Sequence, residues 1–381
     1  MFGFNFGKKI FVGLDIGTSS IKMVELKIVG GKPLLSNYAW MPVYAFLEKY
    51  DPSSNYFDLA LPEYIRRMVK VAGFKGREVY ASVPAFGGLI TLIELPEMED
   101  ADLEQAIRFE AHKYIPTSLD EVILGWEIIG RKPADNGNGE KKEPESEQIR
   151  DGENSANSSQ ASEVPKGRIQ ILLVAASKNK VAKHEKAIRG SGLRLKNIEI
   201  ESFSMVNSLV GNDPGNFIIV DIGSRICNII LVEKGIIKAN RNIDAGGKDI
   251  TKTISKSMGV DEDGAERMKI SDKNFFSRES NLTFPALEII SGEVARMTSA
   301  FYRDGSSKID AVILSGGTAN FTGIEEYFSN ALKIKTIIGN PFSRVGYNKK
   351  LETKLAKMGT QFSVCVGLAL KGVDEYFKNK K

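Results

Sequence analysis

A short pattern occurs twice in this chain, and the repeat constrains the fold more than any other feature of the sequence. Residues 12–26 read VGLDIGTSSIKMVEL and residues 217–235 read FIIVDIGSRICNIILVEKG. Each copy is an apolar run, Asp-Ile-Gly, a short polar turn and a second apolar run, which is the pattern of a β-hairpin. Asp15 and Asp221 hold the same place in the two copies. Two similar hairpins this far apart predict two related lobes that face each other across a cleft.

The turn of each hairpin has the composition of a phosphate-binding loop. Gly17 has no β-carbon, so the backbone can approach a phosphate, and the turn N–H groups with the hydroxyls of Thr18 and Ser19 can donate to phosphate oxygens. A carboxylate needs a cation between itself and a phosphate, and hydrated magnesium held by Asp15 and Asp221 suits that role. One strand that ends in Asp-x-Gly usually marks only a turn. The pair, in separate halves of the chain, predicts a nucleotide site.

A third element supports this interpretation. Residues 312–324, VILSGGTANFTGI, run from an apolar strand into Gly316, Gly317 and Thr318. Paired glycines at this point would let adenosine and the α-phosphate lie against the backbone near a helix start. No GxxxxGK[ST] occurs, and no GxGxxG opens a helix, so the P-loop and Rossmann classes are excluded.

Length and charge narrow the function further. A chain of 381 residues is expected to form two or more domains, and a net charge of +4 does not argue for a nucleic-acid surface. No apolar stretch approaches the roughly 20 residues that cross a bilayer. The segment MFGFNFGKK has no apolar core of signal-peptide length. Its phenylalanines beside Lys8 and Lys9 could touch a membrane surface, but a frayed terminus is the favoured interpretation.

The cysteines and histidines do not predict a metal site. Cys227 and Cys365 both lie in apolar stretches and are expected to be buried thiols in a reducing cytoplasm. His112 and His184 are far apart in the sequence, so zinc and haem sites are not expected. Both histidines are expected on helix surfaces.

One segment differs sharply from the rest of the chain. Residues 131–167 contain only Ile149 and Val164 as large aliphatic residues, so this insert is predicted to be a mobile loop. Strand-like runs at 121–129 and 168–176 flank it, so the insert is expected to join two neighbouring strands; a linker between independent domains is the alternative. Mixed helices and strands elsewhere indicate an α/β protein. Helices are expected at 102–115, 179–189, 202–210, 248–258, 261–269, 285–303, 323–332 and 361–377, and further strands at 197–203 and 310–317.

These motifs resemble a known superfamily. DIGTSS, DIGS and LSGGTANFTG are similar to the first phosphate, second phosphate and adenosine motifs of actin, heat-shock-70 proteins and sugar kinases. Within that superfamily the chain resembles the type IV pilus assembly family PilM, a relative of the division protein FtsA, over nearly all of residues 8–377 outside the insert. Residues 96–121 discriminate best, since actin, heat-shock-70 proteins and sugar kinases have nothing like them. The stretches that carry the resemblance are GLDIGTSSIKMVEL, LPEMEDADLEQAIRFEAHKYIPTSLDEV, ILLVAASKNKV, IEIESFSMVNSL, GAERMKI and CVGLAL.

The resemblance implies a two-lobed actin-like fold, a duplicated ribonuclease-H-like α/β fold with an FtsA-type small subdomain inserted in the first lobe. The small subdomain would span 86–195 and contain the insert. The expected ranges of the other parts are 8–85, 196–215 and 356–381 for the first lobe, 216–248 and 308–355 for the second lobe, and 249–307 for its outer subdomain.

The resemblance also assigns site residues. Glu201 and Asp221 would orient water if ATP is hydrolysed, and Asp15 and Asp221 would hold Mg²⁺ through water. Arg225 and Ile226 stand where the family has small or hydroxylated residues, so Arg225 would either reach a phosphate or form a surface salt bridge. The residues implied to contact ATP or ADP are Asp15, Gly17, Thr18, Ser19, Lys22, Gly223, Ser224, Gly247, Glu266, Lys269, Gly316, Gly317 and Thr318. For Gly247, Glu266 and Lys269, which would line the ribose and base, a plain turn and solvated helix charges are an equal alternative.

By the same resemblance, the function would be that of a cytoplasmic ATP-binding scaffold of the type IV pilus machine, at the inner face of the cytoplasmic membrane. The cytoplasmic tail of a PilN-type protein would dock in a groove between the first lobe and the small subdomain, and the assembly and retraction ATPases are further candidate partners. The resemblance leaves three questions open: whether ATP is slowly hydrolysed, whether the chain forms a homo-oligomer, and whether it serves a related secretion system instead. The alternatives are a small-molecule kinase and an FtsA-like filament-forming division protein. No sugar-binding polar cluster is visible in the sequence, which argues against the kinase. The segment EYFKNKK has too few apolar residues for an FtsA-like anchor.

Overall fold

The computed structural model describes most of the chain. The described residues are 9–43, 56–86, 88–115, 117–132, 167–277, 280, 282–303 and 308–380. Apart from its first two residues and its last one, the predicted mobile insert 131–167 lies outside them, and so do residues 1–8 with their phenylalanines.

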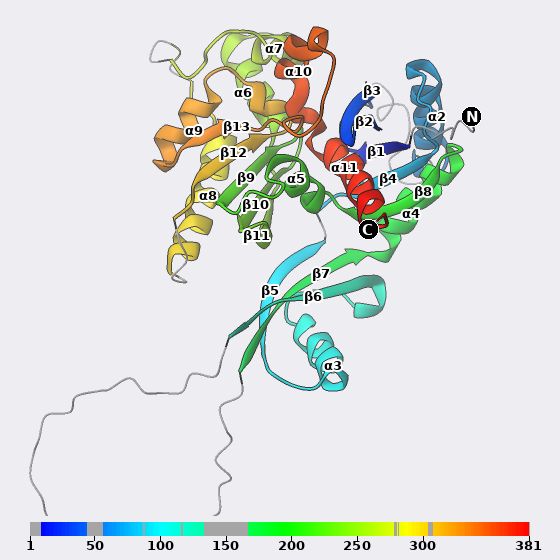
Figure 1. Ribbon diagram of the computed structural model, residues 1–381. Helices are drawn as coiled ribbons and strands as arrows, with labels where there is room; N and C mark the ends of the chain where they lie inside the picture. Colours follow the sequence, from blue (N-terminus) through cyan, green and yellow to red (C-terminus); the bar gives the residue numbers. More distant parts are fainter. Residues whose placement is uncertain are drawn as a thin grey trace, which may run out of the picture.

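Two five-stranded sheets have the same strand order (Figure 1). In each sheet an antiparallel meander of three strands continues into two strands that run parallel to its first strand. The order is β3-β2-β1-β4-β8 in the first lobe and β11-β10-β9-β12-β13 in the second. The two sheets confirm the duplication that the repeated hairpin predicts. Their bounds are β1 (Ile10–Ile16), β2 (Ser20–Val29), β3 (Lys32–Pro42), β4 (Glu78–Val83) and β8 (Arg194–Ile200), then β9 (Asn216–Ile222), β10 (Cys227–Glu233), β11 (Ile236–Ile243), β12 (Ala311–Ser315) and β13 (Thr336–Ile338).

A third, smaller sheet lies below the two lobes in Figure 1, and its residues Ile90 and Leu172 join the core that the lobes share. It has the order β5 (Leu89–Pro96), β7 (Arg168–Ser177), β6 (Val122–Lys132), and all its pairs are antiparallel. Helix α3 (Asp100–Ala111) packs Leu103 and Ile107 onto one face of it. Because β6 and β7 are hydrogen-bonded neighbours, the prediction that the insert joins adjacent strands is confirmed.

Helix α4 (Lys178–Gly190) leads back into the first lobe. Its residues Ala187 and Ile188 share a core with α2 (Leu61–Ala72) and with β1. The residues before α2 form a single turn, η1 (Tyr56–Ala60). Since α4 packs on the first lobe, we propose that the small subdomain ends after β7 rather than at residue 195; the other domain boundaries stay predictions.

The helices of the second lobe lie close to the residue ranges that the sequence predicts for them. Helix α8 (Pro285–Arg303) spans the predicted range, and the others begin and end within about two residues of theirs. Short turns complete the chain. The elements are α6 (Gly247–Met258), α7 (Glu262–Lys269), α9 (Ile324–Leu332) and α10 (Glu352–Met358), with turns η2 (Leu119–Glu121), η3 (Gly317–Asn320), η4 (Lys349–Leu351) and η5 (Gly359–Phe362).

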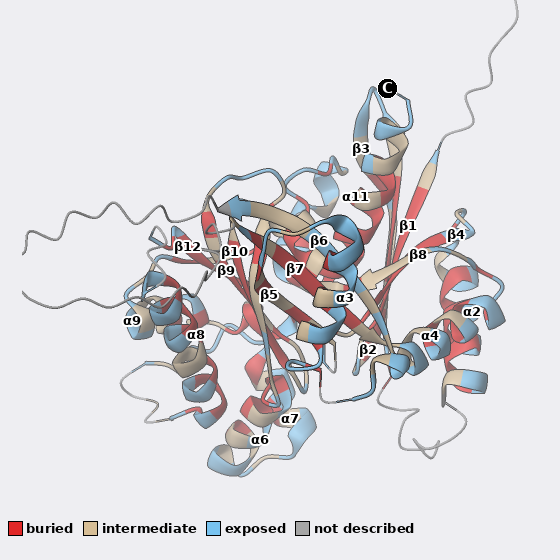
Figure 2. Cartoon of the chain, turned by 90° about the horizontal axis from the view of Figure 1, so that it is seen from below, coloured by how far each residue is buried: buried red, intermediate tan, exposed pale blue. Residues whose placement is uncertain are grey.

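Two helices join the lobes at the centre of the molecule. Helix α11 (Ser363–Lys378) packs on β1 and on α5 (Glu201–Leu209), and it is buried over most of its length (Figure 2). Its side chains share one core with residues of both sheets, such as Val24 of β2 and Ile230 of β10. The hinge between the lobes is therefore built on a continuous apolar core.

The prediction that both histidines lie on helix surfaces is confirmed for His112 and wrong for His184. His112 is exposed at the end of α3, as expected. His184 is only 4% exposed, because the face of α4 that carries it packs on the first lobe. Its Nδ1 lies 2.8 Å from the carbonyl oxygen of Lys180 and its ring contacts Phe57, and burial lowers its pKa.

Both cysteines are buried free thiols, as predicted. Within the described ranges, no helix has the length and apolar character needed to cross a membrane, and no three acidic, cysteine or histidine side chains converge as metal ligands.

Candidate nucleotide-binding site

The two hairpins have the same local geometry. In the first, Asp15 pairs across the strands with Lys22, and the Gly17 N–H donates to the Ser20 carbonyl over 3.1 Å. In the second, the equivalent bond runs from the Gly223 N–H to the Ile226 carbonyl, also over 3.1 Å. The repeat seen in the sequence is therefore a repeat of the turn itself.

Glycine fits closely at three of the predicted positions, tightly at Gly17 and with no room for a β-carbon at Gly223 and Gly316. A β-carbon at Gly17 would lie 3.1 Å from the Ser20 oxygen, and one at Gly223 would lie 2.8 Å from the Ile226 oxygen. Gly316 has φ of +85°, and its β-carbon would lie 2.5 Å from the carbonyl oxygen of Ile222. The close approach at Gly316 shows that the Gly316–Gly317 turn lies against the end of β9, the first strand of the second hairpin.

A half-buried lysine lies near the acidic residues of both hairpins. Asp15 is 6% exposed, and the Lys22 ammonium lies 3.2 Å from its Oδ2. The Ser82 hydroxyl of β4 donates to Asp15 Oδ1 over 3.5 Å. Burial lowers the pKa of Lys22, but the negative charges around it, including Asp15 and Asp221, raise that pKa by more. Lys22 therefore acts as the cation that lets carboxylates from both hairpins lie near one another.

Two further carboxyl groups face this cluster. Burial raises the pKa of Asp221 to about 6, while the Ser315 hydroxyl and Lys22 act in the opposite direction. Burial and the charge of Asp15 raise the pKa of Glu201 to about 8. The structure thus brings Asp15, Lys22, Asp221 and Glu201 together from four different elements.

The raised pKa of Glu201 predicts a pH dependence of stability. Its pKa is 4.5 as a free side chain and about 8 in the folded chain, so the native state holds an extra proton between those values. Stability should therefore fall as pH rises, by up to about 1.4 kcal/mol per unit for this one group. Asp221 contributes with the same sign only up to its pKa of about 6.

The Glu201→Gln variant is the direct check. Between pH 6 and pH 8 its unfolding free energy in urea should depend less on pH than that of the wild type, and above pH 8 it should be the more stable protein. Glu326→Gln, at an exposed position of α9, supplies the control and should keep the wild-type slope. Equal slopes for wild type and Glu201→Gln would contradict the assignment.

The backbone of Ala85 links this cluster to the rest of the molecule. Ala85 follows β4 at the entry to the small subdomain. Its N–H donates to Glu201 Oε1 over 3.0 Å, and its carbonyl accepts from Asn242 of β11 over 3.3 Å. One residue therefore connects the candidate site, the second lobe and the path into the small subdomain.

The residues predicted to line the ribose and base have internal partners. The Lys269 ammonium donates to Glu266 Oε2 at 2.6 Å, to Thr251 Oγ1 at 2.9 Å and to the Gly247 carbonyl at 3.1 Å. The Gly247 N–H in turn donates to the carbonyl of Gly223 over 2.8 Å. These contacts tie the start of α6 to the second phosphate loop, and Lys269 and Glu266 are not simply solvated helix charges.

The remaining predicted residues lie on the turns themselves. Thr18 and Gly317 are exposed, Ser19 and Ser224 are half-buried, and Thr318 is buried beside Gly247. Arg225 Nε lies 3.1 Å from Asp244 Oδ1 and both side chains are well exposed, so the surface salt bridge is the alternative that the structure supports.

Sequence reasoning missed three polar residues near the hinge. Asn228 occupies in the second hairpin the place of Lys22 in the first, and it donates to the Ser202 hydroxyl over 3.1 Å. The buried Oδ1 atoms of Asn228 and Asn242 have no hydrogen-bond donor among the described residues. Aligning the two hairpins residue by residue would have found Asn228. Nothing in the sequence marks Ser202 or Asn242.

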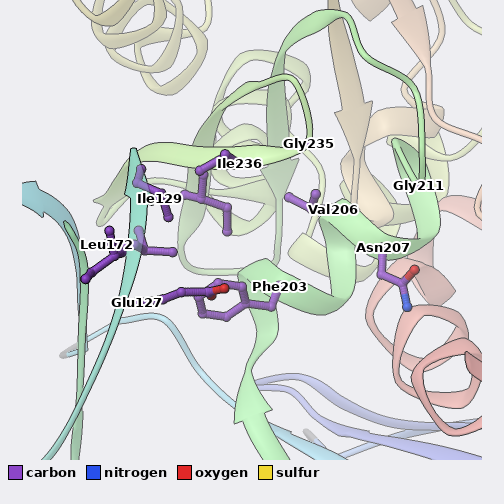
Figure 3. Close-up of a pocket in the computed structure, with 11 residues that line it drawn as sticks. Glu127, Ile129, Leu172, Phe203, Val206, Asn207, Gly211, Gly235 and Ile236 are labelled. Carbon is purple, nitrogen blue, oxygen red and sulfur yellow. The ribbon is translucent and has the colours of Figure 1, made fainter. Parts of the chain in front are cut away.

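A groove of about 530 Å³ lies on the other side of the hinge (Figure 3). Residues from β6, β7, α5 and the β10–β11 turn line it, and Figure 3 shows their side chains facing one space. Those that matter below are Ile129, Leu172, Phe203, Val206, Ile236 and Glu127. The groove is mainly apolar, with one carboxylate.

Three comparisons place the chain among known proteins. A family model described as type IV pilus assembly protein PilM matches residues 13–141 and 157–373. The cell division protein FtsA of Neisseria meningitidis is 23% identical over 232 residues, which are 52% of this chain and 53% of FtsA. FtsA of Helicobacter pylori is 28% identical over 102 residues, 26% of this chain and 21% of that protein. The chain thus spans about half the length of the first relative and about a fifth of the second.

A solved structure agrees with the family match. The structure titled PilM-PilN type IV pilus biogenesis complex superposes with a TM-score of 0.72 and 25% identity, covering 95% of this chain and 98% of that chain. Together with the duplicated sheets, this identifies the two-lobed actin-like fold with an FtsA-type subdomain that the sequence predicts. The chain belongs to the PilM family of type IV pilus assembly proteins.

Proposed function

We propose that this chain is a nucleotide-controlled scaffold: it binds ATP or ADP with magnesium between its lobes and docks the cytoplasmic tail of a PilN-type partner. The observation that carries the nucleotide part is the cluster of Asp15, Lys22, Asp221 and Glu201 between two matched glycine turns. A partner of this type would hold the chain at the inner face of the cytoplasmic membrane.

The donor set suits a magnesium nucleotide. The Gly17 and Gly223 turns offer backbone N–H groups without a β-carbon in the way, and Lys22 offers a positive charge for phosphate. Asp15 and Asp221 would hold the magnesium through water, as this ion prefers. Bound magnesium would supply positive charge against the phosphates, and Lys22 would add a further positive charge beside Asp15. Glu201 would lie beside the terminal phosphate.

The groove is the proposed docking site for the partner tail. The solved PilM-PilN complex is a complex of a similar chain, which supports a PilN-type partner here. The apolar lining suits a short apolar peptide, and Glu127 suits a basic residue in it. The lining comes from β6 and β7 of the small subdomain, from α5 of the first lobe and from the β10–β11 turn of the second lobe, which supports docking where these parts meet.

Two elements connect the nucleotide site with the groove. Helix α5 carries Glu201 at its first residue and Phe203 and Val206 in the groove lining. The β10–β11 hairpin has Asn228 near the cluster at one end and Ile236 in the groove at the other. A change of the angle between the lobes would therefore move Ile236 relative to β6 and β7. Nucleotide binding would set the width of the groove in this way.

Calorimetry with a PilN-type tail peptide tests this function. Phe203→Ala should lower the affinity for the peptide by about tenfold or more, because an aromatic anchor in the groove is lost. Phe109→Ala removes the same side chain from a position that is 73% exposed on α3, and it should leave binding unchanged. Asp15→Ala should still bind the peptide, but without any response to ATP and magnesium.

The outcomes separate the two parts of the proposal. Tight nucleotide binding with no peptide binding under any condition would overturn the scaffold part. If the wild type bound the peptide equally well with and without nucleotide, only the proposal that nucleotide controls docking would be overturned.

A further inference from the structure

Three asparagines of the second lobe face the hinge from one side of its sheet. Asn228 of β10 pairs across the strands with Asp221 of β9 and with Asn242 of β11. Residues that pair directly, and residues two apart on one strand, point to the same face of a sheet, so Asn240 shares that face. Helix α5 contacts both strands there, where its Ser202 meets Asn228. We call Asn228, Asn240 and Asn242 the asparagine row.

The asparagine row is hydrogen-bonded to the first lobe. The Asn228 amide donates to the Ser202 hydroxyl over 3.1 Å, and that hydroxyl donates to Asn240 Oδ1 over 3.0 Å. The Asn242 amide donates to the carbonyl of Ala85, which follows β4, over 3.3 Å. The core around these bonds is apolar and its contacts are not directional, whereas a hydrogen bond tolerates only a narrow range of geometry. The three bonds therefore specify the angle between the lobes more closely than the surrounding core does.

The network is only partly satisfied in this arrangement. Ser202 is fully buried and Asn228 is 2% exposed. The Oδ1 atoms of Asn228 and Asn242 are buried and have no donor among the described residues. A buried amide oxygen without a donor costs free energy, so a rotation of the lobes that gives such an oxygen a partner offsets the loss of a bond elsewhere. The network can therefore exchange partners between two lobe angles of similar free energy.

The asparagine row lies between the nucleotide site and the groove. On the first turn of α5, Ser202 stands between Glu201 of the candidate site and Phe203 of the groove lining. On the other side of the bonds, the β10–β11 hairpin carries Ile236 to the groove. A change at these bonds therefore displaces Phe203 relative to Ile236.

We propose that the asparagine row couples the nucleotide site to the groove, by setting the free-energy difference between two lobe angles. The inference rests on the proposed function, and it assigns the coupling to positioning residues that touch neither nucleotide nor peptide. Its measure is the coupling factor, the ratio of the peptide dissociation constants without and with ATP and magnesium. A change in the preference between lobe angles changes this factor, whereas a loss of stability alone does not.

Calorimetry on the full chain with the PilN-type tail peptide tests the assignment. Ser202→Ala deletes one hydroxyl and with it two of the three bonds. A hydrogen bond shifts an equilibrium by about fivefold, so the coupling factor should change by about that much or more. Ser208→Ala is the matched control, because Ser208 is as deeply buried on α5 but donates to the Met205 carbonyl of its own helix over 3.2 Å. It should keep the wild-type coupling factor.

A second pair of variants examines the bond to Ala85. Asn242→Ala removes that bond alone and should also change the coupling factor. In Asn37→Ala the lost bond is again one from an asparagine amide to an alanine carbonyl, that of Ala72 at 2.7 Å, but it lies within the first lobe. This control should leave the coupling factor unchanged.

The outcomes separate this inference from the function on which it rests. If Ser202→Ala and Asn242→Ala kept the wild-type coupling factor, the asparagine row would not carry the coupling, while the nucleotide-controlled scaffold would stand. Equal changes in the variants and their controls would also overturn the inference, because the factor would then follow stability. If the wild type bound no peptide, or bound it equally with and without nucleotide, the proposed function would fail and the inference with it.

Discussion

The Gly367→Ala variant is expected to lose about 4 kcal/mol or more of its unfolding free energy. Gly367 lies inside α11, where an alanine would normally stabilise a helix by about 1 kcal/mol. Here a β-carbon would lie 1.8 Å from the carbonyl oxygen of Ser204 on α5. Close-packed interiors do not yield by that much without separating the two helices. The contact should therefore reverse the sign of the substitution.

The contact is part of a longer seam. On the other side of α11, a β-carbon at Gly13 of β1 would lie 1.9 Å from the carbonyl oxygen of Cys365. Helix α11 is thus held at backbone contact with both the first sheet and the hinge helix. Moving it away would open the core shared by the two lobes.

Urea unfolding of Gly367→Ala and Gly292→Ala side by side gives the measurement. Gly292 is a helical glycine of α8 whose β-carbon would meet only the Arg296 side chain, at 4.0 Å. Its substitution should be neutral or stabilising by up to about 1 kcal/mol. If Gly367→Ala were as stable as the wild type, the close packing of α11 on α5 would be wrong.

Local patterns predicted much of this fold. The hairpins, the strand before Gly316 and helix α8 each depend on residues near one another in sequence, so their periodicity and turn residues indicate them directly. The repeat predicted two related lobes, and the two sheets share one strand order, but the order itself could not be derived from the hairpins alone.

Contacts between distant segments were not predictable in the same way. The polar surface of α4 gave no sign that the side of the helix bearing His184 packs on the first lobe. Likewise, the composition of α7 could not show that Lys269 would be buried against the carbonyl of Gly247. In both cases the partner comes from a segment that the sequence pattern does not place.

The residues of the candidate site fall into the same two groups, those that a local pattern predicts and those that depend on contacts between distant segments. Asp15, Gly17, Asp221 and Gly223 stand within the repeated pattern and could be named from it. The bridge from Glu201 through Ala85 to Asn242 could not, because it joins α5, the turn after β4 and β11 through a backbone group. Backbone N–H and C=O groups occur at every position, so the sequence does not mark which of them a fold will use.

Removing the charge of Lys22 should have the largest effect at the candidate site. In Lys22→Met the carboxylates of Asp15 and Asp221 and the carboxyl group of Glu201 lose the cation that lies 3.2 Å from Asp15 Oδ2. Breaking a buried ion pair on one side costs about 3–5 kcal/mol, so the variant should be less stable by roughly that amount at neutral pH. Its nucleotide affinity should fall by about tenfold to a hundredfold, as for the loss of a charged hydrogen bond.

The pH dependence distinguishes lost charge from lost packing. Lys22 holds down the pKa values of Asp221 and Glu201, so both should rise further in Lys22→Met. The native state of the variant would then hold extra protons over a wider range, and its stability should recover as pH falls toward 5. Added magnesium should also restore part of the stability, since it replaces the missing cation.

Lys27→Met is the matched control, because Lys27 lies on the same strand and forms no salt bridge with any carboxylate of the described residues. It should change neither the pH slope of urea unfolding nor nucleotide affinity. If Lys22→Met instead lost a constant amount of stability from pH 5 to pH 8 with no response to magnesium, Lys22 would be a packing residue. The four ionisable groups would then not form one electrostatic unit, and the proposed nucleotide site would depend on the glycine turns alone.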